Sequence, residues 1–342
     1  MLLITAVGVT LMISLLAPVA LRPLLAKRGI IDIPNGRSSH NHRAIRGLGL
    51  GSLIAIVIGL VILELGTADP VESALVWAIL SVCAASGLLG WLEDARGLPV
   101  VARALGQLAI GTAGAAVIVA VVHGPWWTVP LFGLGIAAYM NVTNFMDGVN
   151  GISGLHGIVV GVAYALIGTI LGMAWLTIAG LILAVAFAGF LPWNVIGKGM
   201  FLGDVGSYLL GGSVAVIAVA AIMEGVPALA LIGPLAIYLA DTGVTLMRRV
   251  VRGERWFEAH RSHLYQRLTD YGQSHLQVAV TVAFFSVAAA AVGLGSIGAS
   301  VWNSILVVLG LLLITVGYFF YVTLWQRRYR STLAVHEQGV AE

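Results

Sequence analysis

Long apolar runs constrain the fold of this chain more than any other feature. A helix that spans a bilayer needs about 20 apolar residues, whereas a barrel strand needs about 10 residues of alternating character. The runs here are unbroken, and charged residues make up only 10% of the chain, against about 25% in a soluble domain. The sequence therefore predicts an all-α integral membrane protein. About eleven transmembrane helices are expected, over residues 2–21, 47–65, 73–92, 104–122, 128–144, 152–170, 174–192, 206–223, 228–247, 276–294 and 303–324.

The distribution of basic residues predicts how these helices are oriented. All 18 Lys and Arg residues fall on one side of the eleven-helix arrangement, at 22–46, 96–103, 198, 248–267 and 327–330. The charges on the opposite side are all acidic, at Glu64, Asp69, Glu72 and Glu224. Because basic loops stay in the cytoplasm, we expect a periplasmic N-terminus and a cytoplasmic C-terminus. The net charge of +3 then reflects topology, and we expect no nucleic-acid partner.

No linker or compositional break divides the chain. We expect one polytopic domain over residues 1–330 and a short cytoplasmic tail over residues 331–342. The polar side chains that combine into motifs lie in five predicted cytoplasmic segments, 32–46, 93–103, 141–151, 193–207 and 248–267. Since these segments share one side of the membrane, the sequence predicts a single cytoplasm-facing active-site cleft.

Two of these segments carry oxygen ligands that suit a metal ion. At the end of the fifth predicted helix, Asn144, Asp147 and Asn150 are three residues apart, which places them on one helical face. A polar helix cap and turn would account for only part of this segment. The segment 201–207 opens the eighth helix, with Asp204 between glycines. Asp204 fits either an N-cap or a ligand of a metal ion that carries phosphate oxygens.

The third predicted helix ends in two adjacent carboxylates, Glu93 and Asp94, and Arg103 follows nine residues after Asp94. Adjacent carboxylates repel each other, so the pair is tolerated most easily near a cation. The alternative interpretation is a solvated helix end.

The segment 260–267 contains four groups that can be cationic, His260, Arg261, His263 and Arg267. It has no Cys and no His-Glu-x-x-His pattern, which disfavours a zinc site. Arg and His beside acidic metal ligands are typical of a phosphate-binding clamp. Acids for Mg²⁺, cations for phosphates and amides for a polar ligand together indicate phosphoryl transfer involving a nucleotide, at a membrane, with a lipid as one substrate.

At these residues the chain resembles the polyprenyl-phosphate N-acetylhexosamine-1-phosphate transferases, which include the O-antigen-initiating enzymes and muramoyl-pentapeptide transferase. The resemblance covers almost the whole chain, through the ordered motifs Asp32–His40, Glu93-Asp94 with Arg103, Asn141–Gly151, Phe201–Ser207 and His260–Arg267. The last motif is most similar to that of the O-antigen-initiating subgroup. Glu93 departs from the usual Asp-Asp pair, and Arg103 stands where many relatives have Lys.

The resemblance implies transfer of an N-acetylhexosamine 1-phosphate from a UDP-sugar to undecaprenyl phosphate in the bacterial inner membrane, with release of UMP. It implies that Asp204 and Asn144 hold Mg²⁺, which Mn²⁺ can replace, and that Asp94 with Glu93 acts at the reacting phosphates. The implied substrate-binding residues are Arg103 at the pyrophosphate, Asn150 near uracil, Asp147 in the same loop, and His260, Arg261, His263 and Arg267 at phosphates and sugar. Related enzymes also imply a homodimer.

Several alternatives stay open at this point. A membrane prenyltransferase also uses Mg²⁺ and acidic motifs, but it needs two Asp-rich clusters and only Glu93-Asp94 resembles one. A secondary transporter would place ionisable groups near mid-membrane, where Asp241 is the deepest candidate. Within the transferase interpretation, the sugar is N-acetylglucosamine or a 6-deoxy relative, and the sequence does not distinguish them.

Overall fold

The computed structural model describes residues 2–33, 43–197, 199–254 and 261–340, with side chains of the last stretch described as far as residue 332. His260 and most of the motif 32–40 therefore lie outside the described residues. The elements, in chain order, are α1 (Leu2–Lys27), β1 (Ile31–Asp32), β2 (Ala44–Ile45), α2 (Leu50–Glu64), α3 (Pro70–Arg96), α4 (Val100–Val121), α5 (Thr128–Met146), α6 (Ile152–Leu171), α7 (Ala174–Val195), α8 (Gly203–Met223), α9 (Ala228–Ile232), the 3₁₀ helix η1 (Gly233–Leu235), α10 (Ala236–Val251), α11 (Leu264–Asp270), α12 (His275–Leu294) and α13 (Val301–Val340).

The prediction of an all-α membrane protein is confirmed. Ten helical segments of the described chain are long and apolar enough to cross a bilayer, with α9, η1 and α10 counted as one segment. Each of the eleven predicted spans falls on a separate helical segment, and the one that fails the length criterion is α2, with 15 residues. Helix α2 is shorter than its predicted span because residues 47–49 turn toward the start of α8, where Leu48 and Gly49 donate backbone hydrogen bonds to Phe201 and Leu202.

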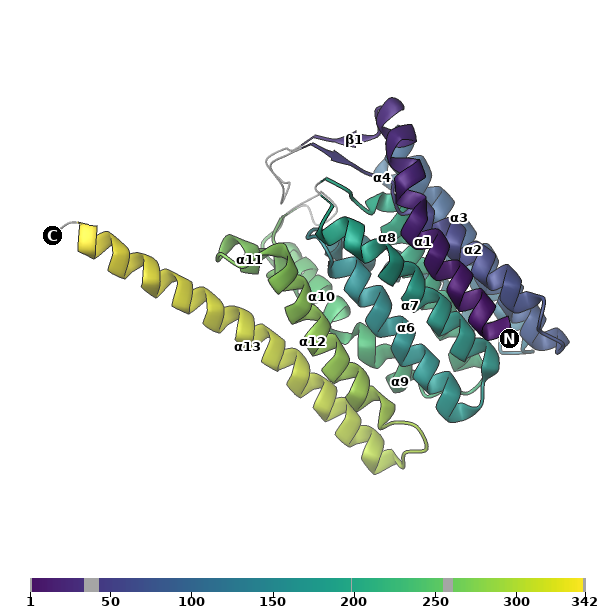
Figure 1. Ribbon diagram of the computed structural model, residues 1–342. Coiled ribbons are helices and arrows are strands. Elements are labelled where there is room, and N and C mark those ends of the chain that lie inside the picture. The colour runs from purple at the N-terminus through teal and green to yellow at the C-terminus, as the bar shows by residue number, and fades with distance from the viewer. Residues whose placement is uncertain (1, 34–42, 198, 255–260, 341–342) are drawn as a thin grey trace.

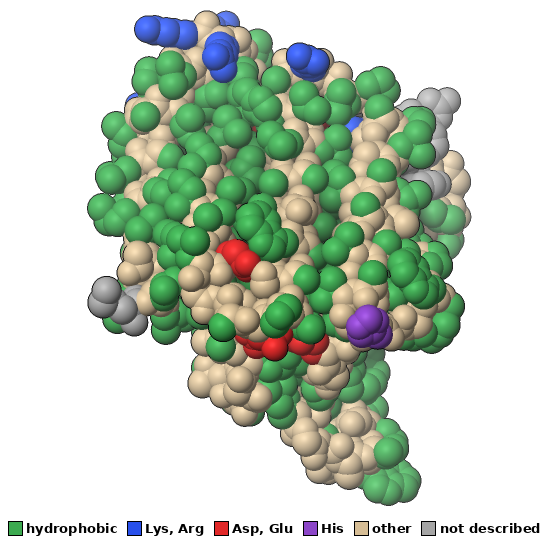
Figure 2. Space-filling model, turned by 90° about the vertical axis from the view of Figure 1, so that its right-hand side faces the viewer, with side chains coloured by type: hydrophobic (Ala, Val, Ile, Leu, Met, Phe, Trp, Pro, Cys, Tyr) green, Lys and Arg blue, Asp and Glu red, His purple; other side chains and the backbone are tan. Residues whose placement is uncertain are grey.

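The helices form one bundle with α8 at its centre (Figure 1). Helix α8 is buried along most of its length and packs against α3 and α5. The peripheral helices instead expose large apolar side chains, such as Leu105 of α4 and Leu313 of α13. Figure 2 shows one hydrophobic face of the bundle, with Lys and Arg along its upper edge and Asp and Glu toward its lower edge. An apolar band between charged ends is the surface that a bilayer requires.

One end of the bundle carries the motif segments, and we call it the motif end. It lies at the upper left of the bundle in Figure 1, where β1 and α11 are labelled. The antiparallel pair β1–β2, with Ile31 opposite Ile45, was not predicted. Strand β2 also continues toward the residues before α8, since Ile45 forms a parallel bridge with Met200. This contact holds the end of the segment 32–46 against the residues that precede α8.

Helices α10 to α13 form a second packing unit beside the central bundle. Their apolar side chains share a core that includes Tyr238, Tyr265, Val282 and Tyr318. Helix α13 extends beyond the bundle (Figure 1) and continues to Val340, so the backbone of the expected tail is helical over residues 331–340.

Candidate functional site

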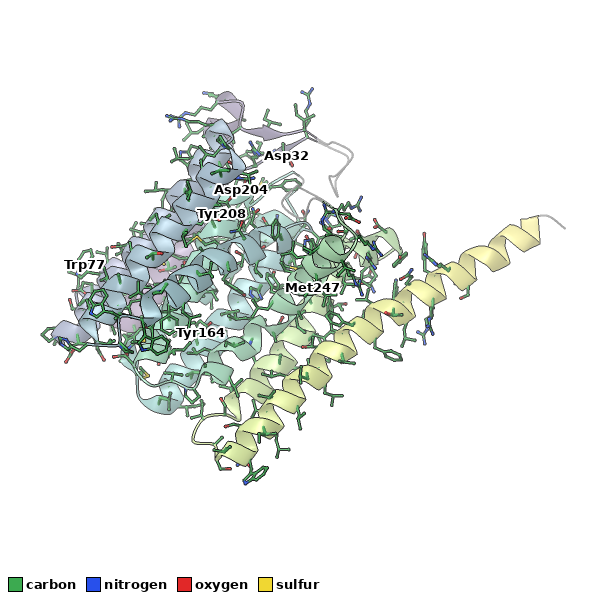
Figure 3. The ribbon with its side chains drawn as sticks, turned by 180° about the vertical axis from the view of Figure 1, so that it is seen from behind. Asp32, Trp77, Tyr164, Asp204, Tyr208 and Met247 are labelled. Atoms are coloured by element: carbon green, nitrogen blue, oxygen red, sulfur yellow. The ribbon has the colours of Figure 1, made fainter. Side chains whose placement is uncertain are left out.

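A polar cleft of about 260 Å³ opens at the motif end. Figure 3 shows two of its acids, Asp32 and Asp204, at the same end of the bundle. The cleft is lined by Asp32, Arg46, Asp94, Asn144, Asp147, Gly148, Val149, Asn150, Asn194, Phe201, Leu202, Gly203, Asp204, Gln266 and His275. Segments from six parts of the chain thus converge on one cavity. This agrees with the prediction that the polar segments lie on one side of the bundle and form a single cleft.

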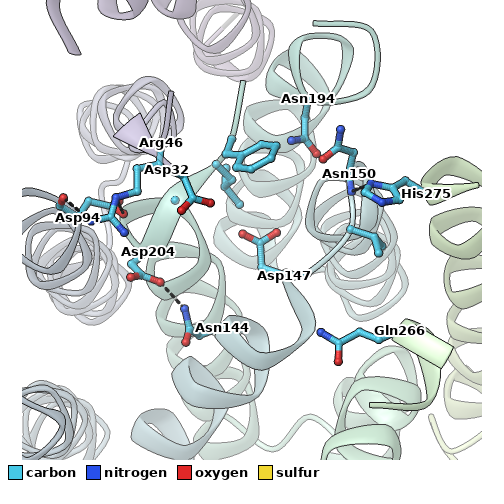
Figure 4. Close-up of a pocket in the computed structure, with 15 residues that line it drawn as sticks. Asp32, Arg46, Asp94, Asn144, Asp147, Asn150, Asn194, Asp204, Gln266 and His275 are labelled. Carbon is cyan, nitrogen blue, oxygen red and sulfur yellow. Dashed lines mark hydrogen bonds and ion pairs between the residues drawn. The ribbon is translucent and has the colours of Figure 1, made fainter. Parts of the chain in front are cut away.

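The lining is divided by chemistry (Figure 4). One side, which we call the carboxylate side, carries the acids together with a cation and an amide: Asp32, Asp94, Asp147, Asp204, Arg46 and Asn144. The other, the amide side, carries neutral hydrogen-bonding groups, namely Asn150, Asn194, Gln266 and His275. The first side suits a metal ion with phosphates, and the second suits an uncharged polar ligand.

A close crossing of α3 and α8 brings Asp94 and Asp204 together. A Cβ atom at Gly90 would overlap the carbonyl oxygen of Asp204, so only glycine allows this approach. Asp94, which is 3% exposed, accepts a hydrogen bond from the backbone N–H of Val205 at 3.0 Å. The carboxylate of one helix therefore caps the N-terminus of the other.

Arg46 contributes the cation nearest to Asp94. Its guanidinium donates to the carbonyl oxygen of Asp94 at 3.0 Å, and its Nε lies 3.7 Å from Asp94 Oδ1. Arg46 is partly exposed to the cleft, so it can face both the buried carboxylate and a bound anion.

Asp204 does not act as a conventional N-cap. Its Oδ1 accepts a hydrogen bond from Asn144 Nδ2 at 2.5 Å, and the same amide nitrogen donates to Ser207 Oγ at 3.1 Å. Leu202 occupies the cap position without a side-chain hydrogen bond. The two predicted metal-holding residues are therefore neighbours on facing helices, and the N-cap interpretation of Asp204 loses its support.

Glu93 and Arg103 lie outside the lining and pair with each other. Arg103 donates to Glu93 Oε1 at 3.2 Å, and Glu93 Oε2 accepts from the backbone N–H of Leu98 at 2.5 Å. The adjacent acids predicted as one pair thus have separate surroundings: Asp94 faces the cleft, while Glu93 fixes the turn between α3 and α4.

Asp147 follows the last residue of α5 and is the acid of the carboxylate side that lies nearest to the amide side (Figure 4). Ser153 donates to its Oδ1 at 2.6 Å. Burial raises the pKa of Asp147 to about 7, and the charges of Asp204 and Asp94 act in the same direction. This carboxyl can therefore hold or release a proton near neutral pH.

The amide side is held by contacts to the turn after α5. Asn150 donates its backbone N–H to His275 Nδ1 at 3.2 Å, and Asn194 Oδ1 accepts from the N–H of Gly151 at 2.6 Å. Gly151 has φ of +90°, a left-handed conformation that glycine adopts without strain.

None of the three described residues of the predicted phosphate clamp lines the cleft. His263 is buried, with Nδ1 3.3 Å from Asp241 Oδ1, and Arg261 pairs with Asp270 at 2.8 Å. Arg267 is half-buried and, like these two, is not a lining residue. The residue of this motif that does line the cleft is Gln266.

Sequence reasoning did not single out five lining residues: Asp32, Arg46, Asn194, Gln266 and His275. The first four lie within the polar segments that were predicted to form the cleft. The sequence therefore indicated their segments but not which residues of those segments line the cavity. His275 precedes a predicted helix and resembles an ordinary helix-flanking residue. Its contact with Asn150 joins positions 125 residues apart, which spacing along the chain cannot reveal.

The donor set fits Mg²⁺. Among the described lining residues, four are carboxylates and the one Arg or Lys is Arg46. Oxygen atoms from one or two carboxylates plus substrate phosphates are the usual Mg²⁺ ligands. The described residues contain no group of three or more His, Cys, Asp or Glu side chains that could hold a metal ion by themselves. Phosphate oxygens would therefore have to complete the coordination.

The α3–α8 crossing can be tested with Gly90→Ala. We expect this change to lower the melting temperature, because overpacking a close contact costs about 1–3 kcal/mol, and to lower turnover by displacing Asp94 from Asp204. Gly135→Ala is the matched control, since a Cβ atom there meets nothing within 4 Å. Thermal unfolding in detergent and turnover of both variants are the measurements. Equal behaviour of the two variants would contradict the role of the crossing.

Comparisons with known proteins agree on one family. Residues 76–222 match glycosyl transferase family 4. The chain is 26% identical over 325 residues to a probable undecaprenyl-phosphate N-acetylglucosaminyl 1-phosphate transferase of Bacillus subtilis (strain 168), covering 88% of this chain and 87% of that protein. It is 25% identical over 322 residues to decaprenyl-phosphate N-acetylglucosaminephosphotransferase of Mycobacterium tuberculosis, covering 81% and 78%. A phospho-N-acetylmuramoyl-pentapeptide-transferase of Clostridium botulinum is 34% identical over 90 residues, covering 26% and 28%.

Proposed function

We propose that this chain, which belongs to the membrane sugar-phosphate transferases of glycosyl transferase family 4, transfers an N-acetylhexosamine 1-phosphate from a UDP-sugar to undecaprenyl phosphate and releases UMP. The observation that carries this proposal is the divided cleft, with acids and Arg46 on one side and amides on the other. The carboxylate side suits the pyrophosphate with its metal ion, and the amide side suits the uncharged nucleoside and sugar.

The chemistry follows from the charge of the acceptor. A phosphate monoester has a second pKa near 6, so it is largely dianionic at neutral pH and needs little help from a base. Asp204 and Asn144 would hold Mg²⁺, which when bound neutralises charge on the pyrophosphate. Arg46 would bind a phosphate oxygen at the cleft, and Arg103 would support the same region through its pair with Glu93. Positioning and charge neutralisation then dominate, as in other phosphoryl transfers.

Direct attack by the acceptor is favoured over a covalent intermediate on Asp94. Asp94 Oδ2 accepts the N–H of Val205 and Oδ1 lies 3.7 Å from Arg46 Nε, so the carboxylate is held between a helix N-terminus and a cation, and a dianionic acceptor does not need it as a nucleophile. We propose that Asp94 orients the acceptor phosphate from its position beside Arg46.

The proposal is tested by transfer of radiolabel from a UDP-sugar into butanol-extractable lipid. The protein in lipid nanodiscs, supplied with undecaprenyl phosphate and Mg²⁺, should produce labelled lipid and UMP in equal amounts. Label incorporation from a prenyl diphosphate instead would indicate a prenyltransferase. Absence of any lipid product would favour the transporter alternative. Comparing UDP-N-acetylglucosamine with 6-deoxy UDP-sugars in the same assay identifies the sugar. O-antigen initiation and a homodimer remain predictions, the second of which is checked by the mass of the particle.

The proposed topology is tested by labelling single cysteines in intact cells. Ala68 and Arg252 are exposed at opposite ends of the bundle, whereas the native Cys83 is buried. A membrane-impermeant maleimide should label Ala68→Cys and should not label Arg252→Cys, because the basic end faces the cytoplasm. Labelling in the reverse pattern would overturn the assignment of the cleft to the cytoplasmic side.

A further inference from the structure

A second carboxylate acts at a helix N-terminus, away from the cleft. Asp241 of α10 is fully buried and does not line the cleft. Its Oδ1 accepts the backbone N–H of Leu264 at 3.0 Å, and its Oδ2 accepts that of Tyr265 at 2.9 Å. Tyr318 of α13 donates its hydroxyl to Oδ2 at 2.7 Å. A buried carboxylate is costly unless it is hydrogen-bonded, and here both oxygens are occupied.

These bonds fix the start of α11. The helix has seven residues, and a helix this short is marginal by itself. Its cap position holds His263, which is not among the favoured N-cap residue types. The N–H groups of Leu264 and Tyr265 are satisfied by a side chain from a different helix, and His263 and Gln266 add a capping box across the first turn. The start of α11 is therefore fixed by Asp241 together with this local cap. These hydrogen bonds also explain why an acid is buried at position 241. The transporter alternative, which would use this acid in a mid-membrane pathway, is not needed to explain it.

Helix α11 in turn borders the amide side of the cleft. Gln266 is one of the lining residues, and its Oε1 accepts the N–H of His263 at 3.3 Å. The Tyr265 hydroxyl donates to the carbonyl oxygen of Phe145 at 2.9 Å. A Cβ atom at Gly148 would overlap this hydroxyl. The turn that carries Asp147 and Asn150 is thus packed directly against α11.

We propose that Asp241 is a positioning residue for donor recognition. It holds α11 from the side away from the cleft, and α11 holds Gln266 and residues 147–150 in the geometry that receives the uncharged part of the UDP-sugar. This inference rests on the proposed function. It adds that recognition of the donor depends on a group that never touches it.

Asp241→Asn tests the proposal, because an amide offers one oxygen where two N–H groups need acceptors. We expect the KM for UDP-sugar to rise about tenfold or more, since small misplacements in binding sites are costly, while the KM for undecaprenyl phosphate stays unchanged. Hydrogen exchange of the peptide over residues 262–268 should become faster. Asp69→Asn is the matched control: its Oδ1 alone accepts both Val71 and Glu72, so Asn preserves that cap.

If Asp241→Asn does not give folded protein, Tyr265→Phe carries the test. It removes the bond to Phe145 and leaves the cap of α11 intact, and the KM for UDP-sugar should again rise. Unchanged donor KM in the folded Asp241→Asn protein, or in Tyr265→Phe, would overturn the proposal. A fall in melting temperature and kcat with both KM values unchanged would also overturn it, since that pattern indicates stability alone. Absence of transfer by the wild-type protein would instead contradict the proposed function.

Discussion

Asp204→Asn is expected to lower kcat by about 10³-fold, because loss of a metal-binding charge removes several kcal/mol of transition-state stabilisation. The structure indicates that the variant will fold. The Asn oxygen can still accept the hydrogen bond from Asn144, and no backbone group depends on the Asp204 side chain as an N-cap. Removing one of four lining carboxylates also reduces their mutual repulsion, so the melting temperature should stay equal or rise.

The measurement is steady-state kinetics in nanodiscs together with thermal unfolding. Asp69→Asn again serves as the control, because it is the same substitution at the opposite end of the bundle and Asn is an equally good N-cap. Near-normal turnover of Asp204→Asn would show that the charge is not needed, and Asp204 would then be only a hydrogen-bonding partner of Asn144.

The helices could be predicted because each is a separate apolar run of about 20 residues. The exception, α2, is shortened by backbone contacts of Leu48 and Gly49 with Phe201 and Leu202. Those contacts join segments about 150 residues apart in the sequence, so local hydropathy cannot predict them. The same applies to β1–β2, whose two-residue strands are stabilised partly by the bridge from Ile45 to Met200.

The candidate site was predictable where a motif coincides with a helix end. Asp94, Asn144, Asp147, Asn150 and Asp204 were all inferred from the sequence, and all line the cleft. The motif 260–267 was harder, because composition indicates cations and does not indicate which residues turn toward the cavity. Once Asp241 fixes the start of α11, Gln266 lines the cleft and His263 is buried behind it.

The way two of these helices are capped explains why their acids were hard to interpret from the sequence. Two of the helix N-termini at the motif end, those of α8 and α11, donate hydrogen bonds to carboxylates from other helices, Asp94 and Asp241. A cap supplied by the same segment leaves a local signature such as Ser-x-x-Glu. A cap supplied by another helix leaves no such signature: Asp94 is one of two adjacent acids at a helix end, and Asp241 is an isolated acid inside an apolar run. In an apolar run, such an acid resembles a catalytic or transport residue, which is how Asp241 entered the transporter alternative.

Removal of divalent metal is expected to have the largest effect of all. EDTA should abolish UMP release by the wild-type protein and added Mg²⁺ should restore it, with Mn²⁺ as a substitute, because the carboxylate side cannot accept a pyrophosphate against its own charge. Among the described residues that line this cleft, four are carboxylates and the one Arg or Lys is Arg46. Full activity in EDTA, with metal depletion verified by elemental analysis, would contradict the metal assignment.

The melting temperature provides a readout that is independent of turnover. Mg²⁺ together with UDP should raise the melting temperature of the wild-type protein, since a ligand at 100 times its Kd stabilises the folded state by about 2.7 kcal/mol. The shift should be much smaller in Asp204→Asn and unchanged in Asp69→Asn, whose carboxylate lies at the N-terminus of α3 and not among the lining residues. Equal shifts in all three proteins would place the metal elsewhere. A shift with UDP alone, undiminished by EDTA, would mean that Arg46 and the amide side bind the nucleotide without a metal ion.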